Sequence, residues 1–192
     1  MSIQLWFPTS IYVKENIISE DENDSFIQEI EKIKSTVSSG GNNWETKVYN
    51  TCDTYDLRKN KKLNKLCQRV EEYTNLFAAQ LNSIHTYKII DSWFNYYNKN
   101  DFQESHHHAG SIFSAVYFFT NPEGSGKLSF ENPIEPDMLP LKNISAINNL
   151  NCLSCNYDPA PRTLIIFRSN IRHMVSRGDN ESPRITAAFN LS

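Results

Sequence analysis

HHHAGSIFSAVYFF (residues 106–119) places three consecutive histidines directly before an apolar run that is typical of a buried β-strand. Side chains two apart on a strand point to the same side. We therefore expect His106 and His108 to share one face and His107 to point away. The segment FRSNIRH (167–173) supplies a further histidine, His173, 65 residues after His108 (173 − 108). A neighbouring strand can bring this third imidazole back to the first two.

Two or three histidines with open positions beside them are how non-haem iron sites are built. Arg184 follows the last histidine, with Thr186 two residues on and on the same strand face. A guanidinium forks onto a carboxylate, so this pair suits an anionic co-substrate. Alone, the triplet would indicate a solvated loop and Arg184 a surface ion pair; together they favour a metal site. Glu131 and Asp137 are alternative carboxylate ligands.

The chain has 192 residues, enough for one domain, and a net charge of −3 with 21% charged residues. No basic field points to nucleic acid, and no apolar stretch reaches membrane-spanning length. The segment MSIQLWFPTSIYV lacks the pattern of a signal peptide. We expect a single domain over 1–192, with helical support in 1–85 and a β core in 86–192, and a cytoplasmic location.

Helical periodicity predicts a helix from Ser19 to Ser38, capped by Ser19, and a second helix over 60–83. The first turn of the second helix is basic, which opposes the helix dipole, so this helix is expected to start later than residue 60. An extended segment (3–13) precedes them. Alternating and β-branched runs predict strands at 86–97, 112–119, 126–131, 163–168, 173–176 and 184–191. Helices followed by mostly antiparallel strands favour a helix-backed β-sandwich, of which the jelly roll is the version that holds ligands in its mouth.

Residues 132–160 are rich in Asn and Pro and are expected to form a long excursion between strands, of the kind that is often functional. Cys152 and Cys155 within it have zinc-ribbon spacing. Because no second Cys or His pair follows, we expect two free cysteines in a loop.

These residues resemble the Fe(II)/2-oxoglutarate dioxygenase superfamily, in particular its small, prolyl-hydroxylase-like 2OG-Fe(II) oxygenases. The resemblance is close over 90–192 and weak in the N-terminal half. It rests on the order and spacing of several motifs: Phe7-Pro8, Trp93-Phe94-Asn95-Tyr96-Tyr97, Gln103 to His108, Ser114-Ala115-Val116-Tyr117-Phe118, Leu164 to Ser169, His173-Met174-Val175 and Arg184 to Asn190.

The resemblance implies a double-stranded β-helix, or jelly roll, backed by α-helices, and an enzyme that uses Fe(II), 2-oxoglutarate and O2. It implies Fe(II) bound by His106, His108 and His173, with no catalytic residue beyond this metal centre. It also implies that Arg184 and Thr186 bind the far carboxylate of 2-oxoglutarate. Tyr97 and Ser114 are weaker co-substrate candidates on the same grounds: Tyr97 stands nine residues before His106 (106 − 97), and Ser114 lies on the strand after the histidines.

One residue departs from the pattern. Most of the superfamily carries Asp or Glu where this chain has His108, so the metal centre would be one unit more positive. The ligand set then approaches that of three-histidine, cupin-type dioxygenases, which use no 2-oxoglutarate. That class, and a non-catalytic metal-binding jelly roll, are the alternatives. The expected activity is hydroxylation of a peptidyl or small-molecule substrate; a homo-oligomer is left open.

Several other residues are expected to have structural roles. His107 is interpreted as a bystander and His85 as a surface or core residue. Trp93, Tyr96 and Tyr117 are expected in the core rather than on a substrate platform. Asn95 shares strand parity with Tyr97 and is expected to face the same cavity.

Overall fold

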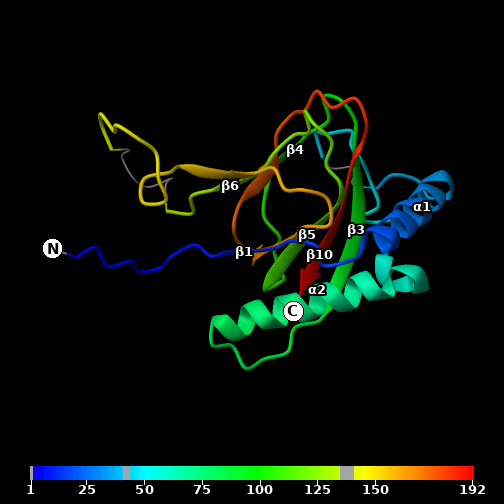
Figure 1. Cartoon of the computed structure of the whole chain (residues 1–192), viewed down its shortest axis with the longest axis horizontal. Coiled ribbons are helices and arrows are strands. Elements are labelled where there is room, and N and C mark those ends of the chain that lie inside the picture. The colour runs from blue at the N-terminus through cyan, green and yellow to red at the C-terminus, as the bar shows by residue number, and fades with distance from the viewer. Residues whose placement is uncertain (1, 41–43, 135–140) are drawn as a thin grey trace.

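The computed structural model describes residues 2–40, 44–134 and 141–192, and its strands form two antiparallel sheets (Figure 1). The larger sheet has the order β1-β8-β5-β10-β3-β2 and the smaller has the order β4-β9-β6-β7. Their bounds are β1 Ile11–Lys14, β2 Tyr49–Asn50, β3 Ile89–Tyr97, β4 Gln103–His106, β5 Phe113–Thr120, β6 Leu128–Glu131, β7 Ser154–Tyr157, β8 Leu164–Arg168, β9 His173–Val175 and β10 Arg184–Leu191. The two sheets face each other as a jelly roll.

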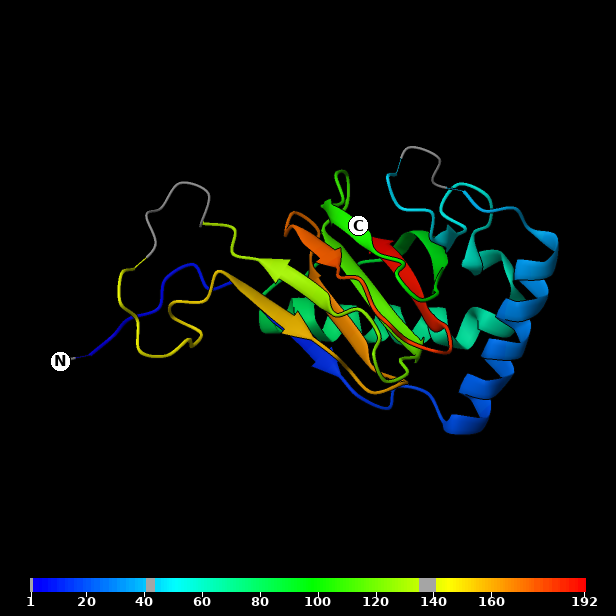
Figure 2. The same ribbon diagram turned by 90° about the horizontal axis from the view of Figure 1, so that it is seen from above.

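Two 17-residue helices, α1 (Glu20–Thr36) and α2 (Asn64–Gln80), support the larger sheet from one side (Figure 2). Ser19 begins α1 with a capping box: its hydroxyl accepts from the backbone N–H of Glu22, and the Glu22 carboxylate accepts from the backbone N–H of Ser19. Two short 3-10 turns, η1 (Leu57–Lys59) and η2 (Lys61–Leu63), lead into α2. Among the described residues, no helix is long and apolar enough to cross a membrane.

Strand alternation divides the larger sheet into a helix-facing side and a cavity-facing side. On β10, Ile185, Ala187 and Phe189 pack into the core cluster that contains the helices, while the even-numbered residues from Arg184 to Asn190 line a cavity. On β3 the even-numbered Phe94 and Tyr96 join the helical core, and the odd-numbered residues from Asp91 to Tyr97 line the cavity. Because side chains alternate along each strand, the helix-facing side of β3 and β10 is apolar, and the polar side chains of these strands gather on the cavity-facing side.

A second, smaller core closes the space between the sheets. It contains Phe130 and Leu128 from β6, Val175 from β9 and Phe167 from β8. The ring of Phe130 lies edge-on to that of Phe167, with centroids 4.8 Å apart. This packing holds β9, which carries His173, against the larger sheet.

The structure refines several predicted boundaries and corrects others. The predicted helices and the six predicted strands are present with ends shifted by a few residues, and 60–83 begins later, at Asn64. The extended segment predicted at 3–13 overlaps β1 (Ile11–Lys14), which precedes α1 and pairs with β8, so one strand of the larger sheet comes before the helices. The excursion 132–160 contains a strand, β7, paired with β6. Strands β2 and β4 were not predicted. The division of the chain at residue 85 stays a prediction.

Candidate functional site

A cavity of about 160 Å³ lies between the two sheets, and its floor is the inner face of β3 and β10. In their antiparallel register Arg184 pairs with Tyr97, Thr186 with Asn95, Ala188 with Trp93, and Asn190 with Asp91. All eight of these residues line the cavity. The cavity therefore runs along the two strands from an Arg184 end to an Asp91 end.

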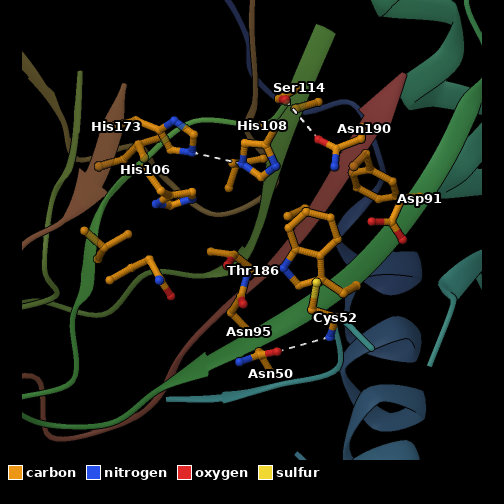
Figure 3. Close-up of a pocket in the computed structure, with 18 of the residues that line it drawn as sticks. Asn50, Cys52, Asp91, Asn95, His106, His108, Ser114, His173, Thr186 and Asn190 are labelled. Carbon is orange, nitrogen blue, oxygen red and sulfur yellow. Dashed lines mark hydrogen bonds between the residues drawn. The ribbon is translucent and has the colours of Figure 1, made fainter. Parts of the chain in front are cut away.

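Three histidines converge on this cavity (Figure 3). His106 ends β4 and pairs with His173 on β9. His108 lies two residues beyond the end of β4, where its backbone N–H donates to the carbonyl oxygen of Ser169 at 2.9 Å. One ring nitrogen of each histidine lies within 4.8 Å of the others. The expectation of one shared strand was wrong for His108, but the chain still turns its ring toward the other two.

Hydrogen bonds to backbone carbonyls orient two of the imidazoles. Nδ1 of His106 lies 2.7 Å from the carbonyl oxygen of Glu104, and Nδ1 of His173 lies 3.0 Å from that of Ile171. A carbonyl only accepts, so each Nδ1 carries the proton and each Nε2 is left with its lone pair. Such bonds fix the tautomer of metal-binding histidines.

The spacing of the ring nitrogens fits one metal ion. Nε2 of His108 and Nε2 of His173 are 3.3 Å apart. Two nitrogens that each bind a metal at about 2.0–2.1 Å are separated by roughly 2.8–3.4 Å for angles between octahedral and tetrahedral values. The cluster contains no carboxylate or thiol from the described residues.

Burial keeps the three imidazoles neutral at pH 7. Desolvation lowers the pKa of His173 to about 2 and that of His108 to about 4, and the neighbouring His106 acts in the same direction on both. Desolvation also lowers the pKa of His106. A neutral imidazole is the form that binds a metal, so no proton has to be displaced at this pH.

Aromatic rings enclose the cluster. Trp93 stacks on His108 at 5.6 Å between centroids, Trp44 lies edge-on to His106 at 5.0 Å, and Phe167 lies edge-on to His173 at 4.7 Å. These rings limit water around the imidazoles and leave one side open to the cavity. Trp93 was expected in the core; it is buried, but it is also a cavity wall.

Arg184 is a buried cation with no acceptor. It is 1% exposed, and its Nε and Nη1 have no hydrogen-bond partner among the described residues. Its Cζ lies 4.9 Å from the ring centroid of Tyr97 and 5.1 Å from that of Phe118. Desolvation lowers its pKa. Buried charges are costly unless paired, so these donors indicate a bound anion supplied from outside the chain.

The other predicted co-substrate residues also line the cavity, and they differ in whether their hydroxyl groups are free to donate a hydrogen bond to a ligand. Thr186 lies on the floor two residues from Arg184. Desolvation raises the pKa of Tyr97 to about 12, so its hydroxyl keeps its proton. Ser114 donates to Oδ1 of Asn190 at 2.9 Å and also contacts Oγ of Ser169 at 2.8 Å. The Ser114 proton is thus already engaged, and its co-substrate role stays a prediction.

Some sequence candidates do not join the cluster. His107 is exposed at the cavity rim, and His85 is exposed and edge-on to Tyr87 at 5.0 Å. Glu131, the alternative ligand, instead accepts from the Ser105 hydroxyl and lies 3.4 Å from Nε of Arg172. Asp137 lies outside the described residues.

Tyr96 and Tyr117 are buried in the helical core, and Asn95 lines the cavity as predicted. Cys152 and Cys155 are free cysteines, and within the described part of the chain neither belongs to a metal-binding cluster.

Several cavity residues were not predicted. Asp91 and Asn190 share the strand parity of Tyr97 and Arg184, so the period of two could have identified both. Trp44, Asn50 and Cys52 come from the segment between the two helices, and no local pattern in the sequence places them at the site.

Comparison with solved structures finds the same fold at low sequence identity. A Pseudomonas putida prolyl-4-hydroxylase matches with a TM-score of 0.63 and 12% identity, covering 95% of this chain and 92% of that one. A viral collagen prolyl hydroxylase from Paramecium bursaria Chlorella virus-1 matches with a TM-score of 0.61 and 13% identity, covering 94% of each chain.

The α-ketoglutarate-dependent epimerase SnoN from nogalamycin biosynthesis matches with a TM-score of 0.71 and 11% identity, covering 95% of this chain and 78% of that one. No curated protein matches in sequence. A family model described as "Putative 2OG-Fe(II) oxygenase" matches residues 91–190, just over half of the chain and the part that carries all three histidines and Arg184. The chain therefore belongs to this family of 2OG-Fe(II) oxygenases, enzymes that use Fe(II), 2-oxoglutarate and O2.

Proposed function

We propose that the protein hydroxylates a C–H bond of a peptidyl or small-molecule substrate, with Fe(II) bound by His106, His108 and His173 and 2-oxoglutarate anchored by Arg184. The observation that carries this proposal is the buried, unpartnered guanidinium of Arg184 in the same cavity as three neutral imidazoles. Together they offer a cationic end for a carboxylate and a nitrogen face for a metal.

The histidines would bind the metal from one side of the cavity. Nε2 of His106 and of His173 are set as lone-pair donors by their Nδ1 hydrogen bonds, and the rings of Trp44, Trp93 and Phe167 hold the imidazoles in place. When bound, Fe(II) supplies the redox chemistry by which O2 and 2-oxoglutarate convert a substrate C–H to C–OH, with release of succinate and CO2.

Arg184 would orient the co-substrate. Its two free N–H groups suit the far carboxylate of 2-oxoglutarate, and the low-polarity walls of Tyr97 and Phe118 strengthen this ion pair by excluding water. Thr186 adds a hydroxyl on the same face. The keto-acid end of the molecule would then lie toward the histidines, because the cavity runs from Arg184 past His108.

An anaerobic titration of the protein with Fe(II) and 2-oxoglutarate tests the proposal. We expect a visible metal-to-ligand charge-transfer absorption that saturates at one equivalent of metal. Glutarate, which has both carboxylates but no keto group, serves as the matched control and should give no such absorption. Absence of the band with 2-oxoglutarate would contradict the proposal.

The three-histidine cluster, which lacks a carboxylate from the described residues, also favours a second candidate: an oxygenation that does not consume 2-oxoglutarate. Succinate formation under O2 separates the two. Neither succinate nor substrate oxidation would be expected of a non-catalytic metal-binding protein.

A further inference from the structure

The end of the cavity opposite Arg184 has its own charge and shape. Asp91 lies there on β3, paired across the ladder with Asn190 and six residues from Tyr97. At about 3.3 Å per residue, Asp91 and the Arg184–Tyr97 pair are roughly 20 Å apart along the strands. Trp93, which stacks on His108, lies between them. His108 therefore lies over the stretch of floor between an Arg184 end and an Asp91 end.

Among the described residues that line the cavity, Asp91 is the sole acidic one. It is half-buried, and within the described part of the chain its carboxylate makes no ion pair and no hydrogen bond with another side chain. Figure 3 shows it next to Asn190, on the far side of the cavity from His106 and His173. Its carboxylate accepts from the backbone N–H of Ser92, so Asp91 is an acceptor that lines the cavity and has no side-chain partner among the described residues.

The nearby charges leave this end negative. Arg58 is the nearby cation, but its Nε and Nη2 are engaged by the carboxylate of Asp56 at 2.6–3.0 Å, and its Nη1 donates to the carbonyl oxygen of Ile89 at 2.8 Å. Asp53 is a further acidic neighbour. Counting Asp53, Asp56 and Asp91 against Arg58 gives a net charge of −2 (−3 + 1).

Burial has the largest effect on the pKa of the Asp91 carboxyl. Desolvation raises this pKa and the charge of Asp56 acts in the same direction, whereas the backbone hydrogen bond from Ser92 and the charge of Arg58 lower it. Cys52, which also lines this end, has its pKa raised to about 11 by burial and by Asp53 and Asp91, so it stays a neutral thiol. A cation placed beside Asp91 would relieve both effects.

The walls and the opposite strand complete a binding site. Trp93 lines the cavity two residues from Asp91 along β3, and an indole face attracts a cation more strongly than other rings do. Asn190 accepts from Ser114 through Oδ1, which leaves its amide N–H groups to donate to a neutral oxygen of the same ligand.

We infer that Asp91 selects substrates bearing an alkylammonium or guanidinium group, which it binds in the cavity beside Trp93. This inference rests on the proposed function and names the substrate class for it. Asp91 lies two residues from Trp93 along β3, so the cation would sit on the order of 7 Å from the level of His108. A short alkyl chain attached to the cation spans this distance. Its carbons would then lie near the ring nitrogens of the histidines.

The test is a titration of the full chain with n-butylammonium, with n-butanol as the neutral analogue and n-butyrate as the anionic one. The indole N–H signals of the three tryptophans report where each probe binds. Trp93 and Trp44 line the cavity, whereas Trp6 is 75% exposed and absent from it, so Trp6 is an internal control. We expect n-butylammonium to shift the Trp93 signal and to bind roughly tenfold more tightly than n-butanol, with n-butyrate weaker still when 2-oxoglutarate occupies Arg184.

Two variants isolate the carboxylate. Asp91→Asn keeps the shape and removes the charge, and should abolish the preference for the cation over n-butanol. Asp53→Asn removes the same charge from an exposed neighbour that does not line the cavity, and should retain most of the preference. Because Asp91 has no ion-pair partner, Asp91→Asn should also unfold at the same or a higher temperature than wild type.

Wild-type protein that shows no Trp93 shift, or Asp91→Asn that binds the cation within about twofold of wild type, overturns the inference. The titration is run with and without Fe(II) and 2-oxoglutarate. If neither of these binds but the Asp91-dependent preference persists, the proposed function fails and the cation site stands. If both bind and the preference is absent, the cation site fails alone.

Discussion

Replacing Arg184 gives the sharpest test of how the cavity binds its co-substrate. Because Nε and Nη1 of Arg184 have no partner among the described residues, both donors are free for a ligand carboxylate. The side chain is 1% exposed, so little water would replace the lost contacts in a shortened variant. Removing one partner of such a charge pair costs roughly 2–5 kcal/mol. At about 1.4 kcal/mol per decade, Arg184→Ala should weaken 2-oxoglutarate binding by roughly thirtyfold to several thousandfold.

Two further variants separate charge, geometry and packing. Arg184→Lys keeps the charge but loses the forked contact, so it should recover part of the affinity. Arg184→Met fills much of the same space without a charge. It should bind 2-oxoglutarate as poorly as Arg184→Ala, yet without co-substrate it should be at least as stable as wild type, because it removes an unpaired buried cation.

The assay is calorimetric titration of 2-oxoglutarate under anaerobic conditions with Fe(II) saturating. Arg168→Met is the matched control, because Arg168 is an exposed strand arginine whose Cζ lies 5.5 Å from the ring centroid of Phe113, outside the cavity. Iron uptake should be unchanged in every variant. If the dissociation constants of wild type, Arg184→Ala and Arg184→Lys agree within about a factor of two, Arg184 does not bind the co-substrate.

Alanine at any one histidine of the cluster should abolish stoichiometric Fe(II), whereas His107→Ala should retain it. Metal analysis after gel filtration decides this, and tight iron in a cluster variant would refute the assignment. Replacing residues 133–152 by a short turn should alter substrate range or uncoupled turnover more than stability, because Asn132 N–H already donates to the Leu153 carbonyl at 2.8 Å and so joins the ends of the segment. Insoluble or unfolded protein would show instead that the segment is structural. Ser19→Ala should cost about 1 kcal/mol in chemical denaturation by removing the α1 cap; an unchanged midpoint would show that the capping box contributes nothing.

The sequence predicted those features that depend on strand periodicity. Arg184, Thr186, Asn95 and Tyr97 lie on the cavity floor because side chains alternate across β3 and β10, and that alternation is visible in the order of residues. The same reasoning, carried along the strands, would have added Asp91 and Asn190. The histidine cluster was predicted because three imidazoles and a following arginine form an uncommon combination.

Other features could not be predicted because long-range contacts determine them. Strand β4 (QESH) and strand β7 (SCNY) lack an apolar alternation, and each exists through pairing with a neighbour, β9 and β6 respectively. The position of His108 beyond β4 depends on its backbone bond to Ser169. Trp44 and Cys52 reach the cavity only because the segment between the helices folds back over β3.

The proposed metal site has His108 where most of the superfamily carries a carboxylate, so the charges around the cavity bear on how it would bind a dication. Three imidazoles contribute no charge, and Arg184 adds one positive charge at the buried end. Asp91, at the far end of the floor, is roughly 20 Å from Arg184 along the strands and does not offset its charge. If the three histidines bind Fe(II) and Arg184 binds 2-oxoglutarate as proposed, the two carboxylates of 2-oxoglutarate would supply most of the negative charge that balances the metal and Arg184. Each ligand then favours the other, and this coupling is reciprocal because it is a free energy shared between two binding sites. With His108 as a ligand, metal binding would therefore depend more strongly on 2-oxoglutarate than it would with a carboxylate at the same position.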